Sequence, residues 1–481
     1  MVNKKQIKNK IKIYFILLTD EYIAQSLNDK ITNYENNLNT AAQWITKQQL
    51  LKVLQTSPSL FQHILSAIPI TLSTPFATEI DAINTNTFFS SYLNQVPITE
   101  QQYTHTAQRI ALPLRSEGFG ILSLRTRCAP SLFTSYAAIA KDTSPTSQQT
   151  WQAYTANPQL NGYYIEARNE ILNLTAGFAA PPTTDAQLFE LDIPQMLSDY
   201  HNTQLTDYTS KCNYLQLQVL AAVRAMGARI VLATWPKSKD TTLPDIPFIH
   251  AMRTRLGVGL PEFFKLNHDN NTICKACNRA DHPAVPEHFT SCPTSHQDTH
   301  RAVINEVFKC TQAAGITEAI IERPLDNNLA IDIWIRDPCP KDVLHPYYMI
   351  DPTIRQAFSA NPNILPNTAR ILKDANTAKY ETYAEQALAL SATVVPLAFT
   401  SFGAYHFEFK KILTNMSRIA IATGNHFPSV DGSFINKWRT NILFTIARAT
   451  ARSASKAALK HNLNYAMEQQ ALLVNVGHPL V

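Results

Sequence analysis

The stretch from residue 318 to residue 354 reads EAIIERPLDNNLAIDIWIRDPCPKDVLHPYYMIDPTI, and it decides the fold. It contains three short runs rich in β-branched and aromatic residues, which are residues 318–324, 329–335 and 347–354. Such runs predict β-strands, and the LDNN sequence supplies a turn between the first two. Pro352 has no backbone N–H, so we expect the third strand to lie at a sheet edge or to bend at this residue.

Helical patterns lie on both sides of these strands. Residues 298–315 carry apolar residues at helical spacing, with Asp298 as the expected N-cap and Gly315 as the expected C-cap. After the strands, residues 365–391 form a long helical pattern, and TVVPLAFTSF at 393–402 indicates a last strand. The predicted order is therefore α, β, β, β, α, β.

Two of the predicted strands each carry an aspartate among apolar neighbours. Asp332 interrupts LAIDIWI, and Asp351 interrupts YMIDPTI. A carboxylate inside an apolar strand is costly unless it is paired or bound to a metal ion, although either residue alone could simply point to water from a strand end. Two carboxylates on consecutive strands are a suitable pair for Mg²⁺, and we expect them to converge with Lys379 of the following helix.

A second candidate metal site lies in CKACNRADHPAVPEHFTSC, residues 274–292. A C-x₂-C pair followed by an H-x₃-C pair supplies four ligands from two short segments, which is the pattern of a closed, structural Zn²⁺ site. The four predicted ligands are Cys274, Cys277, His288 and Cys292. His282 is the alternative histidine, but it lacks the short spacing to the last cysteine. The competing interpretation is three unrelated cysteines in a loop.

Composition bounds the class of protein. The chain has 481 residues, of which 45% are hydrophobic and 16% charged, so it is long enough for several globular domains. The net charge of +5 is small, and any basic surface for nucleic acid has to be local. The seven cysteines are an odd number, which favours a reducing nuclear or cytoplasmic compartment over secretion. The sequence has no run of about 18 apolar residues, so we expect no membrane span.

The patterns predict a multidomain α+β protein. Residues 41–75 have helical spacing stopped by prolines, and helical patterns continue to residue 235; the polar sequence PKSKDTTLPDIP at 236–247 then indicates a boundary. The predicted segments are a basic N-terminal arm (1–40), an all-α module (41–235), a zinc-knuckle region (236–297), the αβββαβ domain (298–410) and a basic helical tail (411–481).

The tail has a basic stripe. It contains no acidic residue between Gly432 and Met467, and four basic residues follow one another at i+4 steps on one helical face. These are Arg448, Arg452, Lys456 and Lys460. A stripe of this kind is either a solvated helix face or a surface for phosphates, and the sequence leaves both open.

The ordered set of motifs resembles the C-terminal half of non-LTR retrotransposon reverse transcriptases, which end in a zinc knuckle and a restriction-like endonuclease of the PD-(D/E)xK type. Besides the four knuckle residues, the resemblance is carried by His300, Glu322 in IERP, Asp332, Asp351 and the pair Lys379-Tyr380. Upstream, LPLRSEGFGILSL with CAPSLFTSYAA, and FIHAMRTRLGV, resemble the linker of the same proteins. The resemblance covers roughly residues 50–450.

The resemblance implies a Mg²⁺-dependent DNA endonuclease. Asp332 and Asp351 would hold Mg²⁺, Lys379 would position the attacking water and the phosphate, and Glu322 would assist at the rim. His300 and the basic stripe would contact nucleic acid, and the zinc knuckle would help to hold DNA through its backbone. The substrate is expected to be DNA, with RNA left open; no membrane is expected, and the sequence does not determine the oligomeric state.

Three positions depart from the family pattern. Ile331 replaces a proline before the strand aspartate, Thr299 stands where the arginine of an Arg-His pair is expected, and Asn376 replaces a second lysine. The chain also has no Asp-Asp pair, so the adjacent carboxylates of a reverse transcriptase centre are not present in it. We therefore expect no polymerase activity, and a separate reverse transcriptase partner remains an open alternative.

Two other functions compete with the nuclease. The chain could be a non-catalytic nucleic-acid-binding remnant or a co-opted DNA-binding protein, which the missing polymerase centre and the altered Arg-His pair favour. It could also be a helical interaction scaffold, in which case residues 319–402 would not form a mixed sheet.

Overall fold

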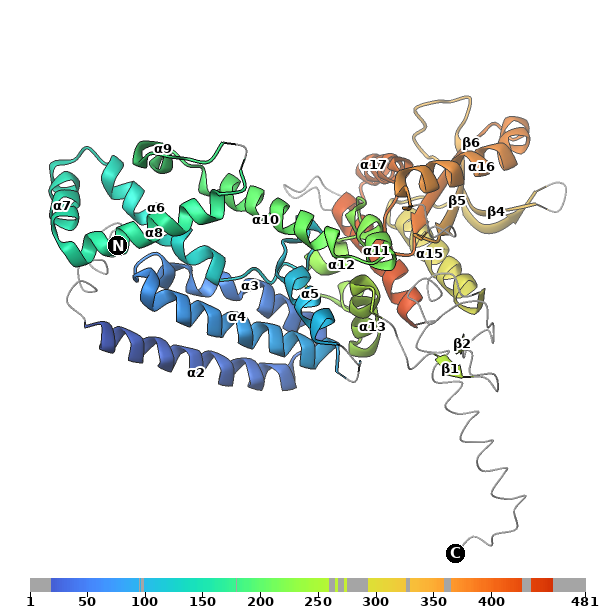
Figure 1. The fold of residues 1–481 in the computed structure, drawn as a ribbon. Coiled ribbons are helices and arrows are strands. Elements are labelled where there is room, and N and C mark those ends of the chain that lie inside the picture. The colour runs from blue at the N-terminus through green and yellow to red at the C-terminus, as the bar shows by residue number, and fades with distance from the viewer. Residues whose placement is uncertain are drawn as a thin grey trace, which may run out of the picture. The chain divides into compact units, whose positions relative to one another are not determined.

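The structure is a computed structural model of the chain. It describes residues 19–94, 96, 99–178, 180–258, 264–266, 272–274, 293–325, 329–358, 365–425 and 434–452. The described residues are mostly helical, with one four-stranded sheet and one two-stranded sheet (Figure 1). The chain divides into two compact units, Met1–Lys211 and Cys212–Val481.

Helices make up the regular structure of the first unit within its described residues. They are α2 (Asp20–Trp44), α3 (Lys47–Leu65), α4 (Ile70–Tyr92), α5 (Glu100–Ala111), η2 (Leu114–Ser116), η3 (Arg125–Arg127), α6 (Cys128–Lys141), α7 (Pro145–Ala156), α8 (Pro158–Thr175), α9 (Asp185–Phe189) and α10 (Ile193–Ser210). The boundary between the units follows Lys211, and the sequence pattern had placed the end of the all-α module at residue 235.

Helix α2 occupies much of the segment predicted as a basic arm. It begins after Thr19, whose side chain accepts a hydrogen bond from the backbone of Tyr22. Ile23, Leu27 and Leu38 are buried on one side of the helix. These apolar residues recur at helical spacing, so residues 20–40 are part of the helical unit.

Prolines do not stop the helices of the first unit as the sequence pattern suggested. Pro58 lies inside α3, where it removes the backbone N–H that would have bonded to the carbonyl of Leu54. The hydroxyl of Ser57 donates to that same carbonyl at 2.9 Å. The side chain therefore satisfies the acceptor that the proline leaves open, and the helix continues.

The second unit holds the sheets. Its elements are α11 (Tyr214–Arg224), α12 (Ile230–Ala233), η4 (Lys239–Thr241), α13 (Asp245–Leu256), β1 (Phe264–Leu266), β2 (Thr272–Cys274), α15 (Pro293–Ala313), β3 (Ala319–Pro324), β4 (Ala330–Arg336), β5 (Tyr347–Arg355), α16 (Thr368–Ala389), β6 (Ala392–Thr400) and α17 (Phe407–Ala422). A further helix covers residues 434–452. The order from α15 to β6 is the predicted α, β, β, β, α, β.

The main sheet has the strand order β3-β4-β5-β6. The first three strands pair antiparallel, and β5 pairs parallel with β6 through the crossover helix α16. The sequence predicted either an edge position or a local bend for the strand at Pro352. The edge position is wrong, because β5 lies inside the sheet. The pairing of β4 with β5 ends at Ile333 and Ile350, however, and Pro352 lies beyond this end. The missing N–H of Pro352 therefore interrupts no hydrogen bond between β4 and β5.

Both faces of the main sheet are covered by helices (Figure 1). On one face, apolar residues of β4, β5 and β6 pack with α15, α17 and helix 434–452 in a single core. On the other face, Trp334, Met349 and Val394 pack with Tyr383 and Ala387 of α16. The described part of the predicted tail is thus packed against the sheet, because α17 and helix 434–452 bury their apolar sides in this core.

Helix α15 begins earlier than the sequence indicated. Asp298 was the expected N-cap, but the helix starts at Pro293. Proline is favoured in the first turn, where its missing N–H leaves no bond unmade. Asp298 is consequently an exposed residue inside the helix.

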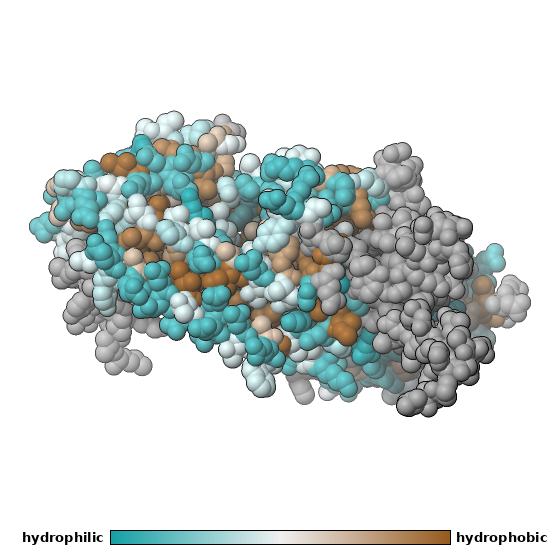
Figure 2. Space-filling view, turned by 60° about the horizontal axis from the view of Figure 1, so that its bottom comes forward, coloured by the Kyte–Doolittle hydropathy of each residue, from teal (hydrophilic) through white to brown (hydrophobic). Residues whose placement is uncertain are grey.

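The described surface is largely polar. Figure 2 shows hydrophilic residues over much of the visible face, with hydrophobic residues in smaller groups between them. Within the described ranges, no helix is both long and apolar enough to cross a membrane.

Candidate active site

The two strand aspartates stand where β4 and β5 separate. Ile333 pairs with Ile350, and continuing this antiparallel register by one residue sets Asp332 opposite Asp351. The side chain of Asp351 is 2% exposed and that of Asp332 is 18% exposed. The sheet therefore brings together the two strand carboxylates that the sequence pattern indicates as a metal-binding pair.

His300 of α15 lies in the fork between these strands. Its Nε2 atom is 2.8 Å from the carbonyl oxygen of Pro352 and 3.2 Å from Oδ2 of Asp332. Both neighbours are acceptors, so Nε2 carries the hydrogen and donates it. The bond to Asp332 is the main cause that raises the pKa of His300 above its usual value. His300 lies against one of the candidate metal ligands, and its expected contact with nucleic acid stays a prediction.

Lys379 reaches the same place from α16. Its Nζ atom donates to Oδ2 of Asp351 at 3.0 Å, and the Lys379 side chain is 28% exposed. Tyr383 lies one turn further along α16, with its ring centroid 5.8 Å from Nζ. The three side chains expected to converge, Asp332, Asp351 and Lys379, thus meet at one end of the β4–β5 pair.

One oxygen of Asp351 is buried without a hydrogen-bond partner. Oδ2 bonds to Lys379, whereas Oδ1 is without a partner in the described part of the chain. The Tyr383 hydroxyl lies beside this carboxylate and acts to lower its pKa, but it donates its hydrogen to the carbonyl of Ala330 at 3.0 Å. Burial and then the neighbouring charge of Asp332 raise the pKa of Asp351 above its usual value, against the opposing effect of Lys379.

The arrangement fits a cation that carries its own water. Among the described residues, no group of three or more His, Cys, Asp and Glu side chains is placed to hold a metal ion. Mg²⁺, however, is commonly bound through only one or two carboxylates, with water and substrate phosphates as the other ligands. Asp332 and Asp351 are such a pair, and the unpartnered Oδ1 offers a lone pair to a cation.

Glu322 was expected to assist at the rim of the site. The β3–β4 register sets it opposite Asp332, but its backbone is left-handed, with φ of 54°. Its carboxylate bonds to Arg301 of α15 at 2.8 Å, and about half of the side chain is exposed, at 49%. Glu322 therefore forms an ion pair at the surface, and its contribution to the site stays a prediction.

The predicted zinc site is described only at its first ligand. Cys274 is buried at the end of β2, where it pairs with Phe264 of β1 in a short antiparallel ladder. The other predicted ligands, Cys277, His288 and Cys292, and the alternative His282, lie outside the described residues.

The basic stripe is partly used for packing. Arg448 donates through Nη2 to the carbonyl oxygens of Lys239 and Asp240 at 2.9 and 2.8 Å. Burial, followed by the positive charge of Arg452, lowers the pKa of Arg448. Arg452 is exposed, and Lys456 and Lys460 lie outside the described residues. The sequence left open whether this stripe is a solvated face or a phosphate surface. Arg448 uses part of its charged group for bonds to the backbone, and its contact with nucleic acid stays a prediction.

Two residues at the site were not predicted to act there. Tyr383 follows Lys379 by four residues on α16, a spacing that would have placed it on the same helix face. Asn376, noted only as a departure from the family pattern, is 2% exposed and accepts a hydrogen bond from the backbone of Ala398 in β6 at 3.0 Å. Its Nδ2 donates to Nδ1 of His406 at 2.6 Å. Asn376 thus fixes α16 to β6 next to Lys379.

No protein-family model matches this chain, and no curated protein matches its sequence.

Proposed function

We propose that this protein is a Mg²⁺-dependent endonuclease that hydrolyses DNA, with a PD-(D/E)xK-like fold in its second unit and an origin in a retrotransposon-type protein. The observation that carries the proposal is the carboxylate of Asp351. It is almost fully buried, bonded on one side to Lys379, opposite Asp332, and without a partner at Oδ1. A buried ionised oxygen is costly, and its retention is explained if a cation is its intended partner.

The described side chains have distinct tasks in this reaction. Asp332 and Asp351 would hold Mg²⁺, which when bound supplies Lewis-acid activation of water and neutralises charge on the phosphate. Lys379 would turn from Asp351 to a non-bridging phosphate oxygen, where its positive charge stabilises the charge that develops as hydrolysis proceeds. A water oxygen bonds to phosphorus while the bond to the leaving sugar oxygen breaks, and that oxygen takes up a proton.

His300 acts in this scheme as a positioning residue. Its Nε2–H is shared between Asp332 and the carbonyl of Pro352, so it holds the Asp332 carboxylate at the fork of the strands. Hydrogen bonds of this kind orient metal-binding groups, and their removal commonly weakens metal affinity by about 10- to 100-fold.

Other parts of the chain would hold the substrate. Arg452 is exposed and can contact a phosphate, together with Lys456 and Lys460. Cys274, Cys277, His288 and Cys292 would bind a structural Zn²⁺ ion and so fix the segment that precedes α15. The substrate class is DNA, with RNA as the alternative, and the compartment is nuclear or cytoplasmic.

The test is nicking of supercoiled plasmid DNA by the full chain in Mg²⁺, Mn²⁺ or EDTA. We expect cleavage that requires the divalent ion and that falls by at least about 100-fold in Asp332→Asn and Asp351→Asn. The matched control is Asp374→Asn, which removes a carboxylate from the exposed face of α16, where it pairs with Arg370. Cleavage by Asp351→Asn at the wild-type rate would disprove the assignment.

A second candidate is a nucleic-acid-binding protein without catalysis. It is favoured by Thr299, which stands where the resembled family has the arginine of an Arg-His pair, and by the lack of an Asp-Asp pair in the sequence. This function predicts DNA binding that weakens steeply with salt, no cleavage in either divalent ion, and the same affinity in wild type and Asp351→Asn.

A further inference from the structure

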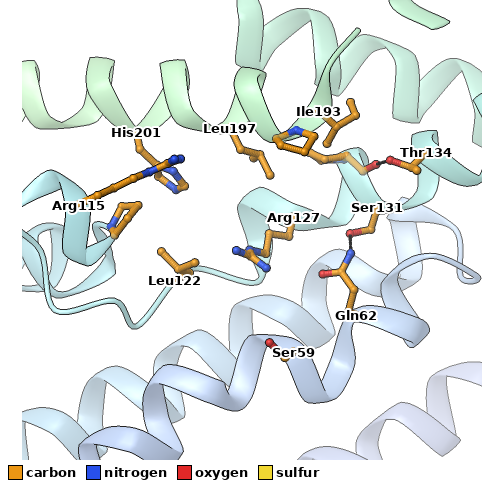
Figure 3. A pocket seen from close by; sticks show the side chains of 13 residues that line it. Ser59, Gln62, Arg115, Leu122, Arg127, Ser131, Thr134, Ile193, Leu197 and His201 are labelled. Carbon is orange, nitrogen blue, oxygen red and sulfur yellow. Dashed lines mark hydrogen bonds between the residues drawn. The ribbon is translucent and has the colours of Figure 1, made fainter. Parts of the chain in front are cut away.

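The first unit contains a cavity of about 640 Å³ that the proposed nuclease does not use. It is lined by residues of α3, α6 and α10 and by the segment from residue 113 to residue 127. Its walls include the apolar side chains of Leu122, Ile193 and Leu197 (Figure 3). A volume between about 300 and 1,000 Å³ with mostly apolar walls and a few polar groups is typical of a small-molecule site.

The polar groups of the cavity are strongly biased toward positive charge. Arg115, Arg127 and His201 line it, and no aspartate or glutamate is among its lining residues. Figure 3 shows these three side chains around the same space. Neither arginine side chain forms an ion pair or a hydrogen bond with another described residue, whereas the nearby Arg125 pairs with Glu170 at 2.8 Å.

His201 is a second, independent observation that points to an anion-binding site. Its side chain lies deep in the wall, the residue is 7% exposed, and its Nδ1 atom is buried without a hydrogen-bond partner among the described residues. Burial, followed by the charges of Arg127 and Arg115, lowers the pKa of His201 to about 4. The histidine thus stands in a positive field that no described side chain compensates.

We propose that this cavity binds a phosphorylated organic molecule of nucleotide size, with its phosphate between Arg115, Arg127 and His201. Two guanidinium groups suit a phosphate because each offers a fork of N–H donors to its oxygens. The apolar wall would contact the body of the ligand, and Gln62, Ser131 and Thr134 supply polar groups beside it. The same chemistry is offered by a free mononucleotide and by the phosphorylated 5′ end of a nucleic-acid strand.

The experiment is isothermal titration calorimetry of the full chain with adenosine 5′-monophosphate and with adenosine. EDTA is present throughout to remove divalent ions. Without such ions Asp332 and Asp351 repel phosphate, so the proposed nuclease site does not contribute to the measured binding. The variants are Arg115→Gln, Arg127→Gln and Arg127→Lys, and the control is Lys30→Gln, which removes a charge from an exposed position on α2. Thermal unfolding of each variant verifies that the first unit is folded.

We expect wild type to bind the monophosphate at least about tenfold more tightly than adenosine, and each arginine-to-glutamine change to weaken that binding about tenfold or more. Arg127→Lys should retain part of the affinity, and Lys30→Gln should leave it within about twofold. Two eight-nucleotide DNA strands, with and without a 5′-phosphate, then compete against the monophosphate. Competition by the phosphorylated strand alone assigns a strand end, and failure of both strands assigns a free nucleotide.

The proposal is overturned by any of three results. Wild type could fail to bind the monophosphate, it could bind adenosine equally well, or the folded glutamine variants could bind the monophosphate as wild type does. None of these results depends on whether the sheet site cleaves DNA, so this proposal and the nuclease proposal stand or fall separately.

Discussion

Replacing Asp351 by asparagine should make the second unit more stable while removing the proposed nuclease activity. The folded-state pKa of Asp351 is raised above its usual value, mainly by burial and by Asp332. The proton is therefore bound more tightly in the folded state, and the associated stability is present below the unfolded pKa and is lost as pH rises through the folded pKa. At neutral pH the ionised carboxylate is a net cost, which an amide of the same shape does not carry.

The magnitude follows from the unpartnered oxygen. A buried polar atom without a partner costs about 1 to 3 kcal/mol, and more when it is charged. In asparagine the oxygen can still accept from Lys379, and the other position then holds a neutral NH₂ group that Asp332 does not repel. We expect Asp351→Asn to raise the free energy of unfolding by about 1 to 2 kcal/mol in EDTA at pH 7. For a unit of this size each kcal/mol corresponds to about 2 to 4 °C in melting temperature.

Differential scanning calorimetry with and without Mg²⁺ is the assay. At a concentration about 100 times its Kd, Mg²⁺ should stabilise wild type by about 2.7 kcal/mol and leave the variant unchanged, so the order of stability reverses. Asp337→Asn is the matched control, because Asp337 is also fully buried in the same unit but has partners for both oxygens, Cys339 N and Arg418 Nη2. Its loss should cost about 3 kcal/mol in either buffer.

The reasoning is refuted if Asp351→Asn lowers the melting temperature in EDTA as Asp337→Asn does, and if Mg²⁺ leaves wild type unchanged. Asp351 and Lys379 would then be a structural ion pair. The pH dependence provides a second check. The difference in free energy of unfolding between wild type and Asp351→Asn should disappear below about pH 3.8, where Asp351 is protonated in the folded and the unfolded state.

Three further outcomes follow from contacts elsewhere. Arg448→Ala should lower the melting temperature by breaking bonds to backbone carbonyls, whereas Arg452→Ala should leave the melting temperature unchanged and weaken DNA binding in a filter assay. The folded-state pKa of His201 is lowered to about 4, so its contribution to the free energy of unfolding is intact above pH 6.5 and is lost as pH falls toward 4. Chemical denaturation between these pH values should show a loss of about 3 kcal/mol in wild type, and His201→Gln should not show it. Asn376→Ala should cost about 1 to 3 kcal/mol by leaving the buried N–H of Ala398 unpaired, with faster amide exchange in β6 as the readout.

The sequence predicted the elements of the second unit well, and it predicted their surroundings less well. Dense β-branched runs and clear helical periodicity located β3 to β6, α15 and α16, because local pattern and tertiary burial agree there. The interior position of β5 was not predicted. A proline disrupts a sheet only where a neighbouring strand would accept the hydrogen bond from its missing N–H, and no residue of β4 pairs with Pro352. Where strands separate is a property of the whole sheet and has no signal in a single run.

The site shows the same division. Asp332, Asp351 and Lys379 were predictable because a charge in an apolar pattern is conspicuous, and the structure brings them together. The roles of His300 and Arg448 were not, since both depend on backbone carbonyls that come from distant parts of the chain. A carbonyl is common to every residue, so sequence patterns cannot indicate which one a side chain will meet.

The bond from Asn376 to β6 sets the angular position of α16. A helix turns by about 100° per residue, so a slip of one residue along the sheet would swing Lys379 away from Asp351. The side-chain amide of Asn376 forms two hydrogen bonds, to Ala398 and His406, and these oppose both sliding and rotation of α16 on the sheet. A lysine at this position would add a positive charge but would give up both hydrogen bonds. Asn376 thus supplies no second cation next to Lys379 and instead keeps Lys379 aligned with Asp351.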